Sequence, residues 1–292
     1  MNTKLNDFKK FIKGKRIAVI GVGISNRPLI RYMFSLGAKI TAFDKLDKDD
    51  EVLSKTIQDM KNEGIEIEWS VGEGYLDALN SSSFDMIFKT PKMRAETPQF
   101  VEAVKKGSIL TTEMELFMAL CPCKIFAITG SDGKTTTTTL VSEMLKASGK
   151  TVYVGGNIGT PLLSRIDDIV ATDYVVLELS SFQLLTMKQS ADVAVVTNVT
   201  PNHLDFHTSY EEYIDTKTNI FKNQSALGRV VLNGKCDITR NMSSLARGQQ
   251  CFFALDKADC DMNSELIPIA YVDNHILTVE AEGVKTPIID ER

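Results

Sequence analysis

Short apolar runs alternate with amphipathic stretches along most of this chain. Runs of this length, bounded by glycine, proline and polar residues, favour buried strands, and the stretches between them favour helices. The runs that we interpret as strands are 16–20, 39–43, 84–88, 109–112, 125–128, 151–154, 174–179, 193–197 and 229–232. Alternation of strands and helices is typical of mostly parallel sheets covered by helices on both faces, so the pattern predicts an α/β protein.

The first part of the chain has the pattern of a Rossmann-like unit. After a short amphipathic helix at 3–14, the first strand leads into a glycine-containing turn at 21–26. A helix is expected to begin near Pro28 and to stop at Gly37, and Asp44 closes the second strand, where a ribose contact is often made. Asn26 stands where a dinucleotide-binding turn has its third glycine, so a different nucleotide is favoured over NAD(P).

The last residues have a different pattern. The runs 269–272 and 275–279, separated by Asp273-Asn274, predict a β-hairpin, and 284–289 is a possible third strand. A domain boundary is expected at Pro122, since a new strand-first unit begins directly afterwards. The chain is therefore predicted to consist of a Rossmann-like domain at 1–121 and a central ATP-binding domain at 122–292, which has a mostly parallel sheet of the P-loop ATPase type and a small hairpin subsheet.

Composition narrows the class of protein. With 292 residues, 43% of them hydrophobic and 24% charged, the chain can bury two substantial cores. A formal net charge of −5 gives no electrostatic case for nucleic acid as a partner. We expect neither a membrane span nor a signal peptide, because no apolar stretch is long enough and the first sixteen residues are highly charged. The five scattered cysteines favour a reduced, cytoplasmic setting.

The clearest candidate chemistry is the segment 129–136, which lies between an apolar strand and a helical pattern. Two glycines allow backbone N–H groups to converge on a polyphosphate, a lysine adds positive charge, and a threonine hydroxyl can reach Mg²⁺. Only two residues separate the glycines, where the common phosphate loop has four. The alternative is an ordinary solvated turn. The residues predicted to bind ATP are Gly130, Ser131, Asp132, Gly133, Lys134, Thr135 and Thr136.

Three polar residues of the second half lie where a core would not favour them. Glu178 ends a near-continuous apolar strand, and we interpret it as a Mg²⁺ ligand rather than an exposed strand-end residue. His203 follows another buried strand, but a single histidine is more often a loop residue than a ligand. Lys217 falls on the apolar stripe of a helix expected from 210 to about 222. It either points inward, as a charge or a reactive amine, or extends its ammonium to water.

Four motifs, in this order, resemble the Mur ligases, the ATP-dependent amide-forming enzymes of peptidoglycan precursor synthesis. They are Thr-Gly-x-x-Gly-Lys-Thr-Thr at 129–136, Gly-Gly-Asn-Ile-Gly at 155–159, Glu-Leu-Ser-Ser-Phe-Gln-Leu at 178–184 and Thr-Asn-Val-Thr-Pro-Asn-His-Leu-Asp at 197–205. Together with the Rossmann-like start, they are most similar to the members that join D-glutamate to UDP-N-acetylmuramoyl-L-alanine. The resemblance implies that the substrate carboxylate is first phosphorylated by ATP and that the amine of D-glutamate then displaces phosphate.

The resemblance also implies a role for particular residues. Lys134 would cradle the β,γ-phosphates, Thr135 and Glu178 would hold one Mg²⁺, and His203 would help to hold a second. Lys217 matches the family's carbamylated lysine, whose carbamate is an anion close to the metal. The catalytic residues would thus be Lys134, His203 and Lys217. The residues that would contact the UDP-linked substrate are Ser25, Asn26, Asp44, Lys45, Thr90, Asn157 and Ser180.

The sequence departs from the family pattern in two ways. Lys92 stands where the family often has glycine after Thr90-Pro91. Family members also continue into a third domain that binds D-glutamate, and nothing up to Arg292 supplies it, so the resemblance implies two domains of a longer enzyme with weak or absent turnover. Three alternatives stay open: a Mur-type ligase for another amino acid, a non-catalytic nucleotide-binding protein, and an NAD-linked protein with an accessory ATPase domain. Folylpolyglutamate synthase shares the loop pattern but lacks the Rossmann-like start.

Overall fold

The computed structural model describes residues 2–260 and 267–290 and confirms the α/β class. Its contacts divide the chain into two compact units. The first contains Met1–Pro122 and Thr160–Ala171, and the second contains Cys123–Gly159 and Thr172–Arg292. The return of residues 160–171 to the first unit was not predicted from the sequence.

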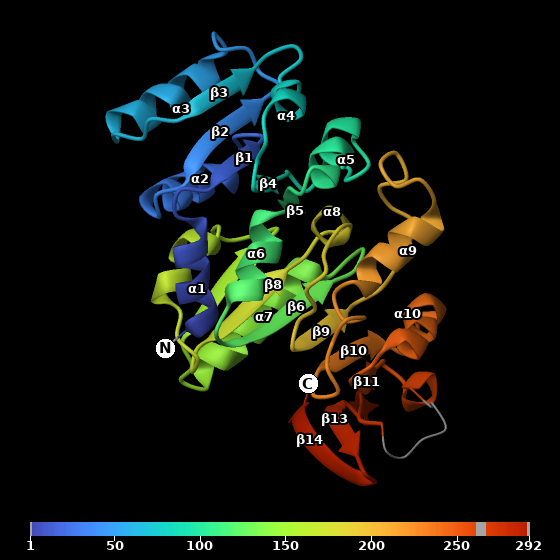
Figure 1. Ribbon diagram of the computed structural model, residues 1–292. Helices are drawn as coiled ribbons and strands as arrows, with labels where there is room; N and C mark the ends of the chain where they lie inside the picture. The colour runs from blue at the N-terminus through green and yellow to red at the C-terminus, as the bar shows by residue number, and fades with distance from the viewer. Residues whose placement is uncertain (1, 261–266, 291–292) are drawn as a thin grey trace. The chain divides into compact units, whose positions relative to one another are not determined.

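The first unit is a five-stranded parallel sheet in the order β3-β2-β1-β4-β5 (Figure 1). Its strands are β1 Arg16–Ile20, β2 Lys39–Asp44, β3 Glu68–Val71, β4 Met86–Phe88 and β5 Ile109–Thr111. Its helices are α1 Thr3–Ile12, α2 Asn26–Ser35, α3 Glu51–Asn62, α4 Ala78–Ser81, α5 Pro98–Lys105, α6 Glu113–Leu120 and the 3-10 helix η1 Leu163–Asp168. The strand order reverses between β1 and β4, and ligands of open α/β sheets bind at the carboxyl ends beside such a point.

The core of the first unit follows from its apolar strands. Residues 17–20 of β1 are all buried, as expected for a parallel strand covered on both faces. Phe43 of β2 meets Phe84 edge-to-face, with ring centroids 5.8 Å apart. Leu79 and Phe100 belong to the same buried cluster and bring α4 and α5 into it. This core fixes the carboxyl ends of β1, β2 and β4 as a rigid edge.

A buried carboxyl attaches the returning segment to the first unit. Glu113, at the start of α6, accepts a hydrogen bond of 3.0 Å from the Leu163 amide. Burial raises the pKa of Glu113 to about 7. The Tyr32 hydroxyl donates to Asp167 in the same segment. These contacts explain why residues 160–171 pack with the first unit although they follow β7 in the chain.

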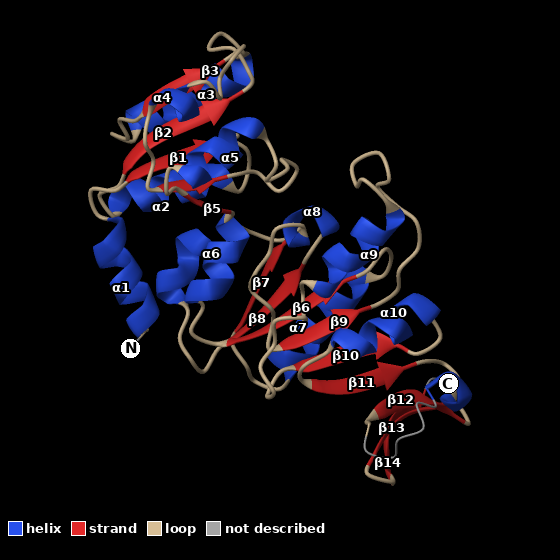
Figure 2. Cartoon of the chain, turned by 45° about the vertical axis from the view of Figure 1, so that its right-hand side comes forward, coloured by secondary structure: helices blue, strands red, loops and turns tan. Residues whose placement is uncertain are grey.

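The second unit is a nine-stranded sheet in the order β14-β13-β12-β11-β10-β9-β6-β8-β7 (Figure 2). Its strands are β6 Lys124–Thr129, β7 Val152–Gly156, β8 Tyr174–Glu178, β9 Val193–Val196, β10 Arg229–Asn233, β11 Gln249–Phe253, β12 Ile269–Asp273, β13 Ile276–Ala281 and β14 Val284–Asp290. Its helices are α7 Lys134–Ala147, α8 Ser181–Leu184, α9 Tyr210–Thr218, α10 Asp237–Met242 and the 3-10 helices η2 Ser243–Leu245 and η3 Lys257–Cys260. The strands from β7 to β12 are parallel.

The C-terminal hairpin is confirmed, with one correction. Its turn lies at Asn274 and His275, which both have positive φ, one residue later than predicted. It joins the large sheet through β12, which pairs in parallel with β11. β13 and β14 then pair antiparallel, so the third predicted strand is confirmed.

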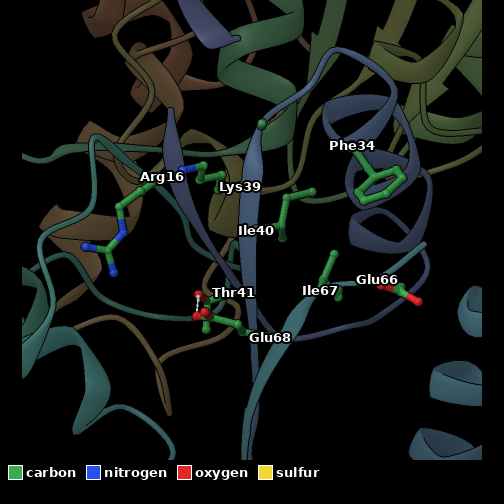
Figure 3. A pocket seen from close by; sticks show the side chains of 9 residues that line it. Arg16, Phe34, Lys39, Ile40, Thr41, Glu66, Ile67 and Glu68 are labelled. Atoms are coloured by element: carbon green, nitrogen blue, oxygen red, sulfur yellow. Dashed lines mark hydrogen bonds between the residues drawn. The ribbon is translucent and has the colours of Figure 1, made fainter. Parts of the chain in front are cut away.

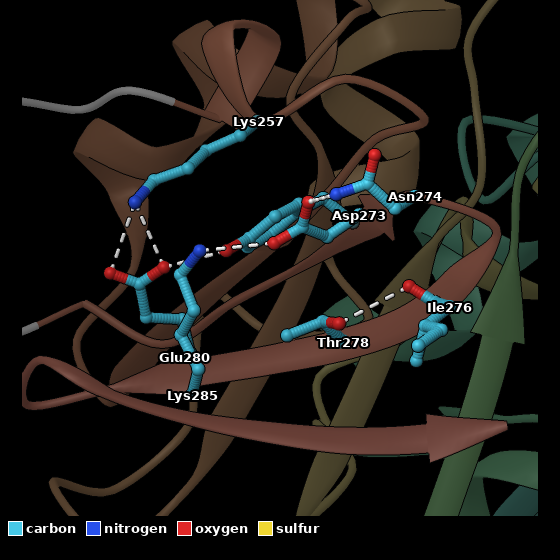
Figure 4. A network of polar contacts seen from close by, with 8 residues as sticks. Lys257, Asp273, Asn274, Ile276, Thr278, Glu280 and Lys285 are labelled. Atoms are coloured by element: carbon cyan, nitrogen blue, oxygen red, sulfur yellow. Dashed lines mark hydrogen bonds and ion pairs between the residues drawn. The ribbon is translucent and has the colours of Figure 1, made fainter.

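A polar network braces this end of the sheet (Figure 4). The carboxylate of Glu280 accepts hydrogen bonds from Lys257 at 3.0 and 2.8 Å and from the Tyr271 hydroxyl at 2.8 Å. Lys285 donates to Asp273 at 3.0 Å and lies over the Tyr271 ring. Because these groups pair within the hairpin and η3, we assign the network to the structure of the sheet end.

Two expectations concern the whole chain. In the part of the chain that the structure describes, no helix is long and apolar enough to cross a membrane. None of the five cysteines, all of which lie within the described residues, forms a disulfide.

Candidate active site

The phosphate-loop segment has the predicted arrangement of strand, glycine turn and helix. β6 ends at Thr129, and α7 begins at Lys134. Gly133 caps the helix with φ 77°, in the left-handed region that favours glycine. Gly130 has φ 148°, and an added Cβ would lie 1.9 Å from the Thr197 hydroxyl oxygen. Both glycines are therefore required by the backbone. The first turn of α7 presents N–H groups that have no acceptor within the helix.

The segment after β9 holds the loop in this conformation. The Ser131 and Asp132 amides donate to the backbone and side-chain oxygens of Asn198, at 3.0 and 2.9 Å. The Thr197 hydroxyl donates to the Asp132 carbonyl at 2.6 Å. The Ser131 hydroxyl contacts Tyr213 and the backbone at Thr200, so it faces the protein interior. The loop is thus pre-organised by its neighbours.

Glu178 lies at the carboxyl end of β8 beside this loop. Register pairs it with Ile128 of β6, one residue before the end of that strand. Its side chain accepts from the Thr135 hydroxyl at 2.7 Å and from the Asn157 amide nitrogen at 2.8 Å. The residue is 1% exposed, so the alternative of a solvated strand-end glutamate is wrong. A hydroxyl and a carboxylate oxygen are ligands that Mg²⁺ prefers.

Lysines approach the loop from two helices. The Lys134 ammonium donates to the carbonyls of Gly130 and Ser131, at 3.1 and 2.7 Å. The Lys217 ammonium, carried by α9, donates to the Gly130 carbonyl at 2.9 Å and lies 4.4 Å from the centre of the Tyr213 ring. Lys217 is 1% exposed, so it points inward and does not extend to water.

The electrostatics at Lys217 favour the neutral amine. Burial lowers its pKa, the Lys134 charge lowers it further, and Asp132 opposes the shift, which brings the pKa to about 7. An amine with this pKa is partly unprotonated near neutral pH. Lys217 therefore has the protonation state that nucleophilic reaction of an amine requires.

The environment of His203 differs from those of Glu178 and Lys217. It is exposed and has φ 54°, and its ring packs against Phe182, with centroids 4.9 Å apart. Within residues 2–260 and 267–290, no group of three or more His, Cys, Asp or Glu side chains could hold a metal ion. The protein oxygens that fit Mg²⁺ are those of Thr135 and Glu178, so further ligands would have to come from a nucleotide, water or a modified lysine.

Residues predicted to bind substrate occupy two kinds of position in the first unit. Asp44 accepts from the amides of Val22 and Leu46, at 2.7 and 3.1 Å, and so lies against the turn after β1. Asn26 is buried, and its amide nitrogen donates to the carbonyls of Ile20 and Gly21. Ser25 and Lys45 are exposed. The Thr90 methyl group packs over Gly21, at the carboxyl ends of β1 and β4.

The two predicted substrate contacts of the second unit are hydrogen-bonded within it. Asn157 comes directly after β7 and donates to Glu178. Ser180 caps α8 through a reciprocal pair of bonds with Gln183: its hydroxyl accepts from the Gln183 amide, and its own amide donates to the Gln183 side chain.

A cavity of about 500 Å³ in the first unit lies elsewhere (Figure 3). Its lining includes Arg16 and Lys39, which begin β1 and β2, and Glu68, which begins β3. It therefore lies toward the amino ends of these strands, and none of the predicted site residues lines it. Parallel sheets bind ligands at the opposite ends of their strands, so the cavity is not the candidate site.

Known proteins resemble this chain over most of its length. The Mur ligase middle domain matches residues 128–286. The UDP-N-acetylmuramoylalanine–D-glutamate ligase of Acetivibrio thermocellus is 57% identical over 254 residues, which are 87% of this chain and 53% of that protein. The chain belongs to the Mur ligase family. The ligase of the same name from Ruminiclostridium cellulolyticum is 53% identical over 290 residues, 99% of this chain and 60% of its own length. The chain thus spans between half and two thirds of these relatives.

Solved structures agree on the fold of this Mur ligase chain. The UDP-N-acetylmuramate:L-alanyl-γ-D-glutamyl-meso-diaminopimelate ligase of Neisseria meningitides matches with a TM-score of 0.53 at 15% identity. The match covers 93% of this chain and 85% of that one. At this identity the likeness concerns the fold alone.

Sequence reasoning missed residues that support the site. Asn198 and Tyr213 were noted only as parts of a motif and a stripe, yet both contact the loop. His207 was not noted at all, although it is buried between α8 and α9. In the first unit, Lys89 ends in an ammonium that is buried at the end of β4, and burial lowers its pKa to about 8. The sequence did carry a signal for Lys89. A charged residue directly after a buried strand is costly unless it is paired, as for Glu178 at the end of its strand.

Proposed function

We propose that the chain carries the nucleotide-binding part of an ATP-dependent ligase that adds D-glutamate to UDP-N-acetylmuramoyl-L-alanine. The observation that carries the proposal is the buried Glu178 carboxylate, which is hydrogen-bonded to Thr135 at the start of α7 and to Asn157 after β7. Curated relatives at 57% and 53% identity have this activity by name. We propose that the reaction takes place in the cytoplasm, in keeping with five cysteines that form no disulfide.

ATP would bind with its phosphates at the loop 130–136. The N–H groups of the first turn of α7 and the Lys134 ammonium supply positive charge toward the β- and γ-phosphates. Mg²⁺ held by Thr135 and Glu178 would neutralise developing charge on the transferred phosphoryl group. Since the carboxylate of Glu178 is already hydrogen-bonded to Thr135, the two ligands need little rearrangement to bind one ion.

The reaction would proceed in two displacement steps. A carboxylate oxygen of the muramoyl-alanine substrate attacks the γ-phosphorus, and the bond to the departing ADP oxygen breaks. The nitrogen of D-glutamate then attacks the acyl carbon, phosphate leaves, and the nitrogen loses a proton. Asn157 and Ser180 would contact the muramoyl-alanine part of the substrate. Positioning and electrostatics supply most of the catalysis in such phosphoryl transfers.

Lys217 would act as a carbamate. Its partly neutral amine, buried beside the Gly130 carbonyl, can attack CO₂ and release a proton, which turns a cation into an anionic oxygen ligand. His203 would help this carbamate to hold a second Mg²⁺. The His203 ring packs against Phe182, which lies in the first turn of α8.

The first unit would bind the uridine diphosphate part of the substrate. Asp44 lies at the carboxyl end of β2, where an acidic side chain meets ribose hydroxyls in related sheets. The exposed Ser25 and Lys45 and the neighbouring Thr90 would complete this surface, and Asn26 would support the turn. The family places D-glutamate in a further domain, so we propose no contact with this amino acid here.

A trapping assay tests the first step without D-glutamate. The chain is incubated with MgATP, UDP-N-acetylmuramoyl-L-alanine and hydroxylamine, which converts an acyl phosphate to a hydroxamate. Hydroxamate and ADP should form in equal amounts and only with all components present. ADP release that does not depend on the muramoyl substrate would contradict the proposal. With amino acids added in place of hydroxylamine, amide formation from D-glutamate rather than other amino acids would separate this ligase from the other Mur-type ligases.

A calorimetric titration separates the remaining alternatives. We expect UDP to bind and NAD not to bind, because the turn after β1 carries Asn26 in place of a third glycine. NAD binding without UDP binding would favour an NAD-linked protein. Binding of MgATP and UDP without any hydroxamate would favour a non-catalytic nucleotide-binding protein.

A further inference from the structure

The imidazole of His207 is buried where α8, α9 and the turn that begins at His203 meet. Its side chain is 0% exposed. The Nε2 atom lies 3.1 Å from the Ser181 hydroxyl oxygen of α8, and Nδ1 lies 3.5 Å from a carboxylate oxygen of Glu212 on α9. The hydrogen bond at Nε2 links the ring to α8, and the contact with Glu212 links it to α9. The ring therefore joins α8 to α9.

Aromatic rings extend this junction to His203 and to the phosphate loop. Phe182 stacks on His207 at 6.1 Å and 17°, and the same Phe182 ring contacts His203. Tyr213 meets His207 edge-to-face at 5.2 Å, and its hydroxyl lies 3.0 Å from the Ser131 hydroxyl in the phosphate loop. Each of these two rings thus contacts His207 on one side and a site residue on the other.

The backbone makes a third connection. The His207 amide donates to the His203 carbonyl at 3.1 Å and closes a turn. His203 itself has φ 54°, a conformation that is uncommon for residues other than glycine and persists only when surrounding contacts hold it. The burial of the His207 ring between α8 and α9 fixes one end of this turn.

We infer that His207 is a positioning residue, which holds His203 and the Tyr213–Ser131 contact in place for the metal-dependent step. The use of this positioning in a metal-dependent step rests on the proposed function. The positioning itself does not. Loss of the imidazole leaves the Ser181 hydroxyl and the Glu212 carboxylate each without one contact. Without these two contacts, the ring at position 207 is no longer held between α8 and α9, so that the stacked Phe182 and with it His203 are free to shift.

Histidine signals offer a direct test, because the chain has only three histidines: His203, His207 and His275. With ¹³Cε1-labelled histidine, the signals are assigned from single substitutions. In metal-free protein, His207→Phe keeps a ring but no nitrogen and should move the His203 signal. His207→Gln keeps an amide that can reach Ser181 and should restore the signal in part. His275→Asn, in the β12–β13 turn, should leave the His203 signal in place. An unmoved His203 signal in His207→Phe would overturn the inference.

Addition of Mn²⁺ and ATP separates this inference from the proposed function. In the unsubstituted protein, Mn²⁺ with ATP should broaden the His203 signal. A signal that does not broaden would count against the metal role of His203. The shift measured in metal-free protein would still test the positioning. In His207→Phe, the Mn²⁺ concentration for half-maximal broadening should rise about tenfold, as for other residues that orient a metal ligand. An unchanged concentration would show that His207 does not position His203 for metal.

Discussion

The glycine turns of the two sheets in this chain lie beside side chains of opposite charge. After β1, the carboxylate of Asp44 accepts from the Val22 amide, and the turn carries an anion at its own backbone. After β6, Lys134 and Lys217 both donate to carbonyls of the loop, and the start of α7 adds further positive charge. The turns therefore differ in charge although the folds are similar. The turn after β6 suits a polyphosphate, and the turn after β1 suits neutral donors such as ribose hydroxyls.

The difference also concerns the residues that hold each turn. Asn26 supports the first turn with its own side chain, through bonds to the carbonyls of Ile20 and Gly21. The second loop is held by a segment far along the chain, through Thr197 and Asn198. The second site consequently depends on strand β9 and on the segment after this strand, where the missed supporting residues lie. Four substitutions can break or sharpen this contrast.

The largest effect is expected for Lys134→Ala. It removes the ammonium that would pair with the phosphates, a loss of about 3 kcal/mol that lowers MgATP affinity roughly a hundredfold. Calorimetric titration measures this, with Lys146→Ala in the last turn of the same helix as the matched control. Equal affinities for the two variants would remove the charge contrast between the sheets.

A smaller effect is expected for Glu178→Gln. The substitution preserves the shape of the side chain and removes its charge, so the Mg²⁺ concentration needed for half-maximal ATP binding should rise about 30-fold. Glu143→Gln, on the exposed side of α7, should leave that concentration unchanged. ATP binding with the same Mg²⁺ requirement in both variants would show that Glu178 is not a metal ligand.

In the first unit, Asp44→Ala tests the acidic edge. The loss of one charge-assisted contact, worth about 1.5 kcal/mol, should weaken UDP binding roughly tenfold and leave MgATP binding unchanged. Exposed Asp49→Ala is the control. Loss of MgATP affinity instead would mean that the acidic edge belongs to the ATP site.

The last prediction is a pH dependence of stability. The pKa of Lys217 is about 7 in the folded protein against a usual value of 10.5, so between these values the unfolded chain binds more protons. The free energy of unfolding should therefore rise with pH from 7 toward 10.5, and this rise should be smaller in Lys217→Met. Urea unfolding in CO₂-free buffer at several pH values measures the difference. Parallel curves would indicate an ordinary lysine.

Burial explains which elements could be predicted from the sequence. β1 and β8 are continuous apolar runs because both faces are covered, and both were predicted within one residue. β3 and β11 were missed, since their residues are mixed in polarity and mostly half-buried or exposed. α9 ends at Thr218, four residues before the predicted end, because the apolar stripe continues through turns after the helix.

The candidate site was predictable where a residue was costly for its position. Glu178 and Lys217 are polar side chains on apolar surfaces, and the structure buries both. A role for His203 was predicted from the family resemblance alone, because an exposed histidine is not costly for its position. His207 could not be found, since Phe182, whose ring stacks on it, is distant in the sequence and meets it only through the fold.

A crystal structure with Mg²⁺ and a non-hydrolysable ATP analogue tests the central claim most directly. The account predicts the triphosphate over the first turn of α7, with Lys134 on the phosphates and one Mg²⁺ bound to Thr135 and Glu178. Triphosphate density at the turn after β1, or a metal that does not touch Glu178, would contradict it.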